Sequence, residues 1–187
     1  MIESRGIVMS SLSGSAAPPA PRWAIVAAHV AALTPLPSAV WRFALVFGSH
    51  GGYTEQGYAD LGMDGWGAAW VVFLSLSTES AALLTLALVR PWGEYPPRWV
   101  PFVGGRRMKP VPVTRIACGA VVVLVLLWAQ FLFWWALPHE DMTDFGADLL
   151  GVLYLPLVLW PPLLAAVTWS YHRRHLAEPT PGSIGRS

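Results

Sequence analysis

Hydrophobic residues gather in four long runs along the chain, and polar segments separate them. The runs cover Trp23–Phe47, Trp66–Val89, Ile116–Leu137 and Leu149–Tyr171. Each run reaches the ~20 apolar residues that an α-helix needs to cross the hydrocarbon core of a bilayer. Lipid offers the backbone no hydrogen-bond partners, so each run is expected to be helical. The pattern therefore predicts an all-α, polytopic membrane protein with four transmembrane helices, packed as an antiparallel bundle.

The segments outside the runs divide the chain into a central domain and two tails. Residues 1–21 are rich in Ser, Ala, Pro and Gly and have no apolar period, which is typical of a disordered tail. We expect a single transmembrane domain over residues 22–175 and a C-terminal tail over residues 176–187.

Positive charge is confined to alternate polar segments. Apart from Arg42, every Lys and Arg lies before the first run, between the second and third runs, or after the fourth run. The other two loops, residues 48–65 and 138–148, contain acidic residues and neither Lys nor Arg. Basic segments stay on the cytoplasmic side of a membrane. This distribution predicts a multi-pass protein of the cell (cytoplasmic) membrane with both termini in the cytoplasm.

Composition agrees with a membrane environment and limits the chemistry. Charged residues make up 12% of the chain, against about 25% in soluble domains. Cys118 is the single cysteine. An intrachain disulfide is therefore excluded, as is thiol oxidoreduction by a cysteine pair. We expect Cys118 to be a small packing residue inside the protein.

Glu79 lies near the middle of the second run. A carboxylate at that depth is costly, so it should face the protein interior and have a partner. Ser75 lies one helical turn away on the same face, together with Ala68, Val72, Ala82 and Leu86. Small residues there would let a neighbouring helix approach closely. Glu79 is either a ligand contact or proton donor, or a hydrogen-bonded structural group.

Arg42 is the second charge within a run. It lies near the outer end of the first run, so we expect its side chain to snorkel outward and to stack on Trp41. The alternative is an outer polar pocket that Arg42 shares with Gln130 and Tyr154, which lie at similar depth. A direct ion pair between Arg42 and Glu79 is not expected, because their depths differ.

His29 lies toward the cytoplasmic end of the first run and projects from nearly the opposite side of that helix to Arg42. A proton relay between His29 and Glu79 is one interpretation, and a packing role is the favoured one. Five prolines interrupt the first and fourth runs: Pro35, Pro37, Pro156, Pro161 and Pro162. They predict bends, which either adjust packing or widen an internal cavity.

Two loops carry further candidate chemistry. The basic loop interleaves aromatic and cationic side chains, which predicts contact with anionic inner-leaflet lipids. Its candidate membrane-surface residues are Arg90, Trp92, Arg98, Trp99, Arg106, Arg107 and Lys109. His139 and Glu140 lie in an acidic outer loop, which we interpret as a solvated rim rather than a metal site. No motif for a cofactor, a phosphate or nucleic acid is present, so neither cofactor nor nucleic acid is expected.

Several short motifs resemble those of a known group of proteins. They include Leu33–Ser38 followed by Trp41-Arg42, Gly65–Gly67, Ser77–Glu79, Leu88–Glu94, Pro97–Pro101 and Gly104–Arg107. They resemble uncharacterised small four-span integral membrane proteins of high-GC actinobacteria, over residues 23–175. The resemblance implies a topology and a bacterial cytoplasmic membrane, and it brings no molecular function.

The polar residues inside the runs favour a binding function. We expect a lipid-like or small apolar ligand, or a partner helix, to bind through the bundle, with Glu79, Arg42, Ser75, Gln130, Tyr154 and His29 as candidate ligand-binding residues. One alternative is an enzyme that acts on an isoprenoid or other lipid-soluble substrate, with Glu79 as catalytic general acid. A second alternative is a proton-coupled carrier. A homo-oligomer or another membrane protein is the expected protein partner.

Overall fold

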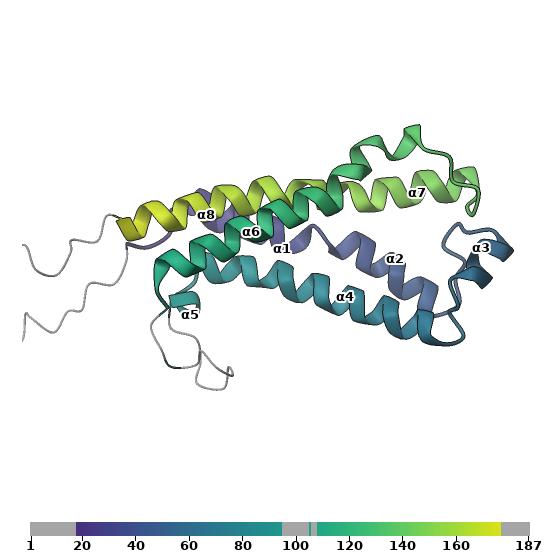
Figure 1. The fold of residues 1–187 in the computed structure, drawn as a ribbon, viewed down its shortest axis with the longest axis horizontal. Coiled ribbons are helices and arrows are strands. Elements are labelled where there is room, and N and C mark those ends of the chain that lie inside the picture. The colour runs from purple at the N-terminus through teal and green to yellow at the C-terminus, as the bar shows by residue number, and fades with distance from the viewer. Residues whose placement is uncertain (1–17, 95–104, 106–107, 177–187) are drawn as a thin grey trace, which may run out of the picture.

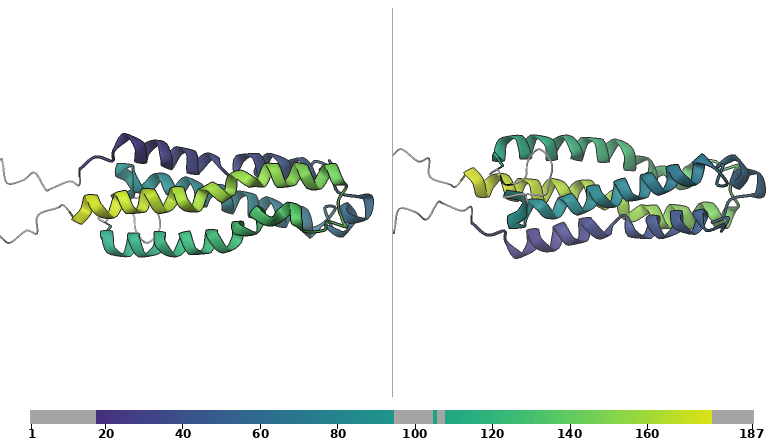
Figure 2. Two further views of the ribbon diagram at one scale, coloured as in Figure 1. Left: turned by 90° about the horizontal axis from the view of Figure 1, so that it is seen from above. Right: turned by 90° about the horizontal axis from the view of Figure 1, so that it is seen from below.

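The protein is built from four long helical segments. The computed structural model describes residues 18–94, 105 and 108–176. The segments Arg22–Val46, Trp66–Leu88, Pro110–Ala136 and Asp144–Leu176 are each long and apolar enough to cross a membrane. They lie side by side along one long axis (Figure 1), and the two perpendicular views agree (Figure 2). The prediction of an all-α protein with four helices long and apolar enough to span a membrane is confirmed for the described residues.

Two of the helical segments begin earlier in the chain than the hydrophobic runs do. The third begins at Pro110 rather than near Ile116, because proline is tolerated in the first helical turn, where the backbone N–H has no partner. The fourth begins at Asp144, where the Thr143 side chain caps the helix by accepting from the Gly146 N–H. A proline in the first turn of one segment and a capping threonine before the other therefore set these two boundaries, and not the ends of the hydrophobic runs.

The first segment is broken where Thr34 and Pro35 separate α1 (Arg22–Leu33) from α2 (Leu36–Val46). Pro35 has no N–H to donate to the carbonyl of Ala31. The Thr34 hydroxyl donates to that carbonyl at 2.8 Å instead. The Ser38 hydroxyl donates to the carbonyl of Pro35, also at 2.8 Å. The Thr34 hydroxyl thus satisfies the carbonyl that loses its donor at Pro35, whereas the Pro35 carbonyl also accepts from the Ala39 N–H at 2.9 Å.

The other three segments change from α to 3₁₀ geometry. In the fourth, α7 (Asp144–Tyr154) passes through η4 (Leu155–Leu159), which contains Pro156, into α8 (Trp160–Leu176). The predicted bends in the first and fourth segments are confirmed. The second ends α4 (Trp66–Leu84) with η2 (Thr85–Leu88), and the third ends α6 (Pro110–Trp128) with η3 (Ala129–Ala136). Neither of these contains a proline at the change, and the sequence did not predict them.

The four segments do not close into a ring. Helix α8 packs against both α1 and α6, α2 packs against α4 and α7, and α1 contacts η2. No comparable packing joins α4 to α6 within the described ranges. The side between α4 and α6 is therefore open, and the two helices diverge along their length (Figure 1).

Small side chains pack between the helices together with larger ones such as Leu157 and Trp160, while many other large apolar side chains point outward. Ala28, Ala31, Ser75 and Ala82 are fully buried, and small residues let helices approach closely. The outward face carries many exposed large side chains, as a lipid-facing surface does. Cys118 is exposed, so the prediction that it packs inside the protein is wrong.

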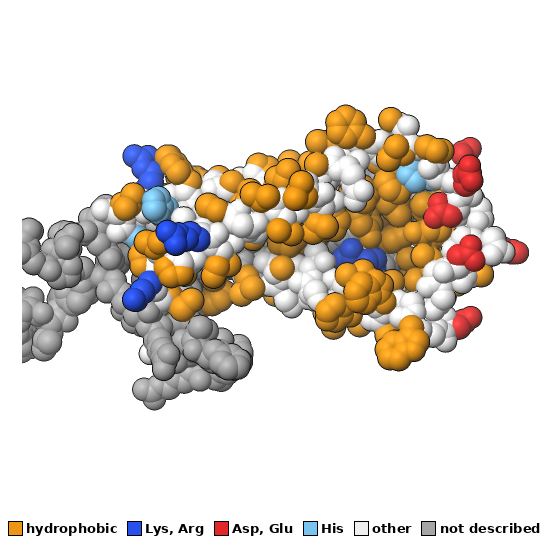
Figure 3. All heavy atoms as spheres, viewed as in Figure 1, with side chains coloured by type: hydrophobic (Ala, Val, Ile, Leu, Met, Phe, Trp, Pro, Cys, Tyr) orange, Lys and Arg blue, Asp and Glu red, His pale blue; other side chains and the backbone are white. Residues whose placement is uncertain are grey.

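Charge is divided between the two ends of the molecule. Figure 3 shows acidic side chains at one end, basic ones at the other, and a mainly hydrophobic band between them. The short helix α5 (Pro91–Glu94) follows η2 at the basic end. Arg98, Trp99, Arg106 and Arg107, together with residues 1–17 and 177–187 of the predicted tails, lie outside the described residues.

At the acidic end, two similar loops are joined. Thr54 caps the short helix α3 (Glu55–Asp60) and accepts from Gly57 N–H, just as Thr143 accepts from Gly146 N–H. The backbone N–H of Thr54 donates to the carbonyl of Asp141 at 3.0 Å, and that of Thr143 donates to the carbonyl of Gly52 at 2.9 Å. Each loop thus caps its own helix and binds the other loop.

Candidate functional site

A buried polar cluster lies in the half of the molecule nearer the acidic end, centred on Arg42 of α2. Its side chain is 6% exposed. Arg42 Nε donates to Ser75 Oγ of α4 at 2.8 Å. Arg42 Nη1 donates to the Tyr154 hydroxyl of α7 at 3.3 Å. The cluster therefore joins three of the four helical segments through one guanidinium.

Aromatic side chains hold the Tyr154 side of this cluster in place. The Tyr154 ring stacks on Phe131 with centroids 4.9 Å apart, and it meets the edge of Trp41 at 5.9 Å. Arg42 lies 5.7 Å from the centroid of the Tyr154 ring, within cation–π range. The prediction that Arg42 snorkels outward and stacks on Trp41 is wrong. The guanidinium instead donates to acceptors inside the protein.

Two polar atoms in and beside the cluster have no hydrogen-bond partner among the described residues. They are Arg42 Nη2 and Glu79 Oε1. Glu79 lies one helical turn beyond Ser75, close enough to Arg42 for their charges to interact. No ion pair joins the two in the part of the chain that the structure describes, as expected from their depths. The cluster thus combines an oriented cation with unused hydrogen-bonding capacity.

Two of the predicted site residues lie elsewhere. Gln130 is exposed, and its side chain donates to the carbonyl of Leu127 on its own helix at 3.1 Å. His29 binds the carbonyl of Ile25 through Nδ1 at 2.7 Å, and its Nε2 lies 3.3 Å from Arg90 Nη2. Among the predicted residues, the structure therefore brings together Arg42, Ser75 and Tyr154, with Glu79 beside them.

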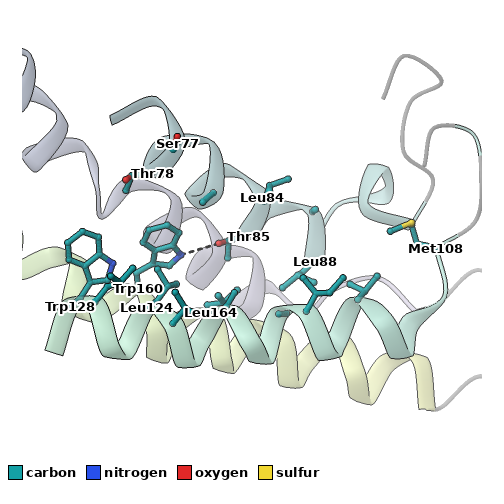
Figure 4. Close-up of a pocket in the computed structure, with 18 residues that line it drawn as sticks. Ser77, Thr78, Leu84, Thr85, Leu88, Met108, Leu124, Trp128, Trp160 and Leu164 are labelled. Carbon is teal, nitrogen blue, oxygen red and sulfur yellow. Dashed lines mark hydrogen bonds between the residues drawn. The ribbon is translucent and has the colours of Figure 1, made fainter. Parts of the chain in front are cut away.

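A groove of about 520 Å³ fills the open side between α4 and α6. Its walls come from α4 and η2 on one side and from α6 on the other, and Trp160 and Leu164 of α8 contribute to its lining. Figure 4 shows Thr78 and Thr85 on the α4–η2 wall, with Trp128 and Trp160 together at one end. Most of the lining is apolar. A groove of this kind suits the hydrocarbon part of a ligand.

The two tryptophans at the end of the groove differ in their hydrogen bonding. Trp160 Nε1 donates to Thr85 Oγ1 at 3.3 Å. Trp128 Nε1 is buried and has no acceptor within the described residues. A buried indole N–H normally finds a partner, so Trp128 holds an unused donor beside the end of the groove nearer the acidic end.

The groove and the Arg42 cluster adjoin one another. The Trp128 ring, which lines the groove, lies 6.3 Å between centroids from the Tyr154 ring. On α4, Ser75 binds Arg42 and Thr78 lines the groove. Three residues of helix separate these two by about 4.5 Å along the axis. Arg42 therefore lies just beyond the end of the groove at which Trp128 lies.

Sequence reasoning missed the groove because it followed the helical face of Glu79. The groove uses the neighbouring face, which carries Thr78, Ala81, Thr85 and Leu88. Their spacing of three and four residues was a readable signal. Nothing in the sequence indicated that α6 would leave that face uncovered.

The two acidic loops do not assemble a metal site in the described part of the chain. No three side chains of His, Cys, Asp or Glu come together there. The His139 ring instead packs on Trp134, with centroids 3.8 Å apart.

Tyr53, in the first acidic loop, is expected to lose its proton only at unusually high pH. Burial raises its pKa to about 12, and the Asp141 carboxylate and Tyr154 add to the effect. Because the folded protein then holds this proton more tightly than the unfolded chain does, stability should fall as pH rises from about 10 to 12. Absorbance at 295 nm should show a late tyrosine titration that Tyr53→Phe removes. Its persistence in Tyr53→Phe would contradict this assignment.

Comparisons with known proteins give no relative: no family model, no curated protein and no solved structure matches this chain.

Proposed function

We propose that the protein is an integral protein of a bacterial cytoplasmic membrane with both termini in the cytoplasm. Four apolar helical segments support the membrane location, and the alternation of basic and acidic segments supports the orientation. The bacterial assignment rests on the motif resemblance alone. In this orientation Arg90, Trp92 and Lys109 lie at the inner surface, where anionic headgroups attract cations.

We propose that its molecular function is to bind one amphipathic, lipid-like ligand in the groove between α4 and α6. The observation that carries this proposal is a groove along the open side of the helix assembly, apolar over most of its length and with an unused Trp128 N–H at one end. The hydrocarbon chain would lie along the apolar walls, and an oxygen of the ligand would accept from Trp128. The lateral opening gives such a ligand access from the bilayer.

The polar end of the groove favours a ligand over a partner helix. A helix satisfies its backbone groups internally, so it brings no acceptor to Trp128 unless a side chain is placed there. An amphiphile has hydrogen-bond acceptors at one end only. This matches the groove, whose unused donor also lies at one end. No observation favours the enzyme or the carrier. Glu79, the candidate general acid, is absent from the groove lining. His29 lies at the basic end, where its Nε2 is near Arg90.

Filling the groove should displace the ligand. In Ala120→Phe the new ring would enter the groove from α6, and in Ala81→Phe it would enter from α4. Val122→Phe is the matched control, because Val122 is 59% exposed and lies two residues, or about 200°, round the same helix from Ala120. We expect native mass spectrometry of gently purified protein to show a bound lipid mass in the wild type and in Val122→Phe. Both groove variants should lose it.

Several results would count against this proposal. A bound mass that both groove variants retain would place the ligand elsewhere. A complex of protein chains alone, lost on filling the groove, would favour the partner-helix interpretation. Circular dichroism of each variant establishes that the helices are intact before either conclusion is drawn.

A further inference from the structure

The guanidinium of Arg42 is held in place but is not neutralised. Its two hydrogen-bond acceptors, Ser75 Oγ and the Tyr154 hydroxyl, are neutral. Its third nitrogen, Nη2, is buried without a partner among the described residues. A buried cation without a counterion is unfavourable, particularly at membrane depth. A protein that only needed helix packing here would do better with an apolar side chain.

The available acid does not act as the counterion. Glu79 is close enough for electrostatic interaction, but the structure contains no ion pair between the two within the ranges it describes. The hydrogen bond from Arg42 Nε to Ser75 keeps the guanidinium one turn short of Glu79. The free Nη2 is therefore available to an anion from outside the chain.

The position of Arg42 relative to the groove indicates where that anion comes from. Arg42 and Trp128 both contact Tyr154, and Trp128 lines the outer end of the groove. Figure 3 shows a recess on this open side, toward the acidic end, with a Lys or Arg side chain among hydrophobic ones. A ligand whose chain lies in the groove would thus place its polar end beside the cluster.

We propose that Arg42 binds the anionic group, a carboxylate or a phosphate, of the amphiphile that occupies the groove. Arginine suits this role because its planar fork forms paired, charge-assisted hydrogen bonds with such oxygens. Ser75 and Tyr154 orient the fork, and Nη2 supplies the unused donors. This inference rests on the proposed groove ligand and adds its chemical class, which is an acidic lipid with one or more hydrocarbon chains.

Binding of matched lipids to the purified full chain in detergent tests the proposal. The probes are palmitate, a monoacylglycerol phosphate and the uncharged hexadecanol, with acetate and inorganic phosphate as free anions. The variants are Arg42→Gln, Arg42→Lys and Ala120→Phe. Arg173→Gln is the control, because that exposed arginine lies at the basic end over Trp169.

We expect Arg42→Gln to weaken the binding of both lipid acids by about tenfold or more. The binding of hexadecanol should weaken by less than about twofold. Arg42→Lys should bind the acids better than Arg42→Gln, because it keeps the charge, and less well than wild type, because it loses the fork. Arg173→Gln should match wild type, and Ala120→Phe should weaken all three lipids. The lysine variant and the preference of the wild type for acid over alcohol remain informative if Arg42→Gln does not fold.

The contrary outcomes separate the two proposals. One outcome is that wild type and Arg42→Gln bind the lipid acids and hexadecanol equally well, while Ala120→Phe weakens binding of the acids and of the alcohol. That outcome would overturn the role of Arg42 but not the groove ligand. Failure of all three lipids to bind would overturn both. Inorganic phosphate or acetate binding as tightly as the lipid acids would show a site for free anions and overturn the assignment to an amphiphile.

Discussion

Replacing Gly146 with alanine is expected to lower the free energy of unfolding by about 2–4 kcal/mol. A Cβ at this position would lie 2.1 Å from the carbonyl oxygen of Gly52 and 2.5 Å from its Cα. Backbone atoms cannot move aside as a flexible side chain can. The substitution should therefore separate the two outer loops and break the hydrogen bonds of Thr143 to Gly52. Equilibrium unfolding in mixed micelles measures the loss.

Gly119→Ala is the matched control for this prediction. Gly119 is also helical, but a Cβ there would meet nothing within 4 Å. Alanine has the higher helix propensity, so this variant should be neutral or more stable by up to about 1 kcal/mol. Similar stabilities of the two variants would mean that the contact between Gly52 and Gly146 contributes little to the fold.

The contact between these two loops was only partly predictable from the sequence. Thr54 and Thr143 are each followed by an acid, one further residue and a glycine. That repeat is a visible capping pattern. That each glycine also lies against the backbone of the opposite loop (Gly57 against Asp141, Gly146 against Gly52) depends on how the two hairpins meet, which no local pattern encodes.

The four spans were predictable because length and hydropathy alone determine them in a lipid environment. The site was predictable only in part. Ser75 and Tyr154 were proposed from depth and helical face, and both bind Arg42. Gln130 has the same depth but faces outward, and depth cannot distinguish the two sides of a helix. The groove depends on which helix pair fails to pack, a property of the whole assembly.

The second large effect concerns the energetic role of Arg42. Ser75→Ala removes the acceptor of Arg42 Nε and leaves a buried charged donor unpaired, which should cost about 2 kcal/mol. Arg42→Met should be neutral or more stable by about 1 kcal/mol, because it replaces an uncompensated buried cation with an apolar side chain of similar length. Ser75 retains its hydrogen bond to the Val71 carbonyl, at 2.8 Å, in that variant.

The double variant completes the test of what Arg42 is for. In the Arg42→Met background, Ser75→Ala should cost less than about 0.5 kcal/mol, because no charged donor is left unpaired. Unfolding in mixed micelles, with the same detergent ratio for all four proteins, measures the coupling free energy between Arg42 and Ser75. If Arg42→Met alone costs several kcal/mol, the cation holds the helices together and needs no ligand to explain it. If the protein keeps its stability but loses its preference for lipid acids, the fold carries an unfavourable cation because binding requires it.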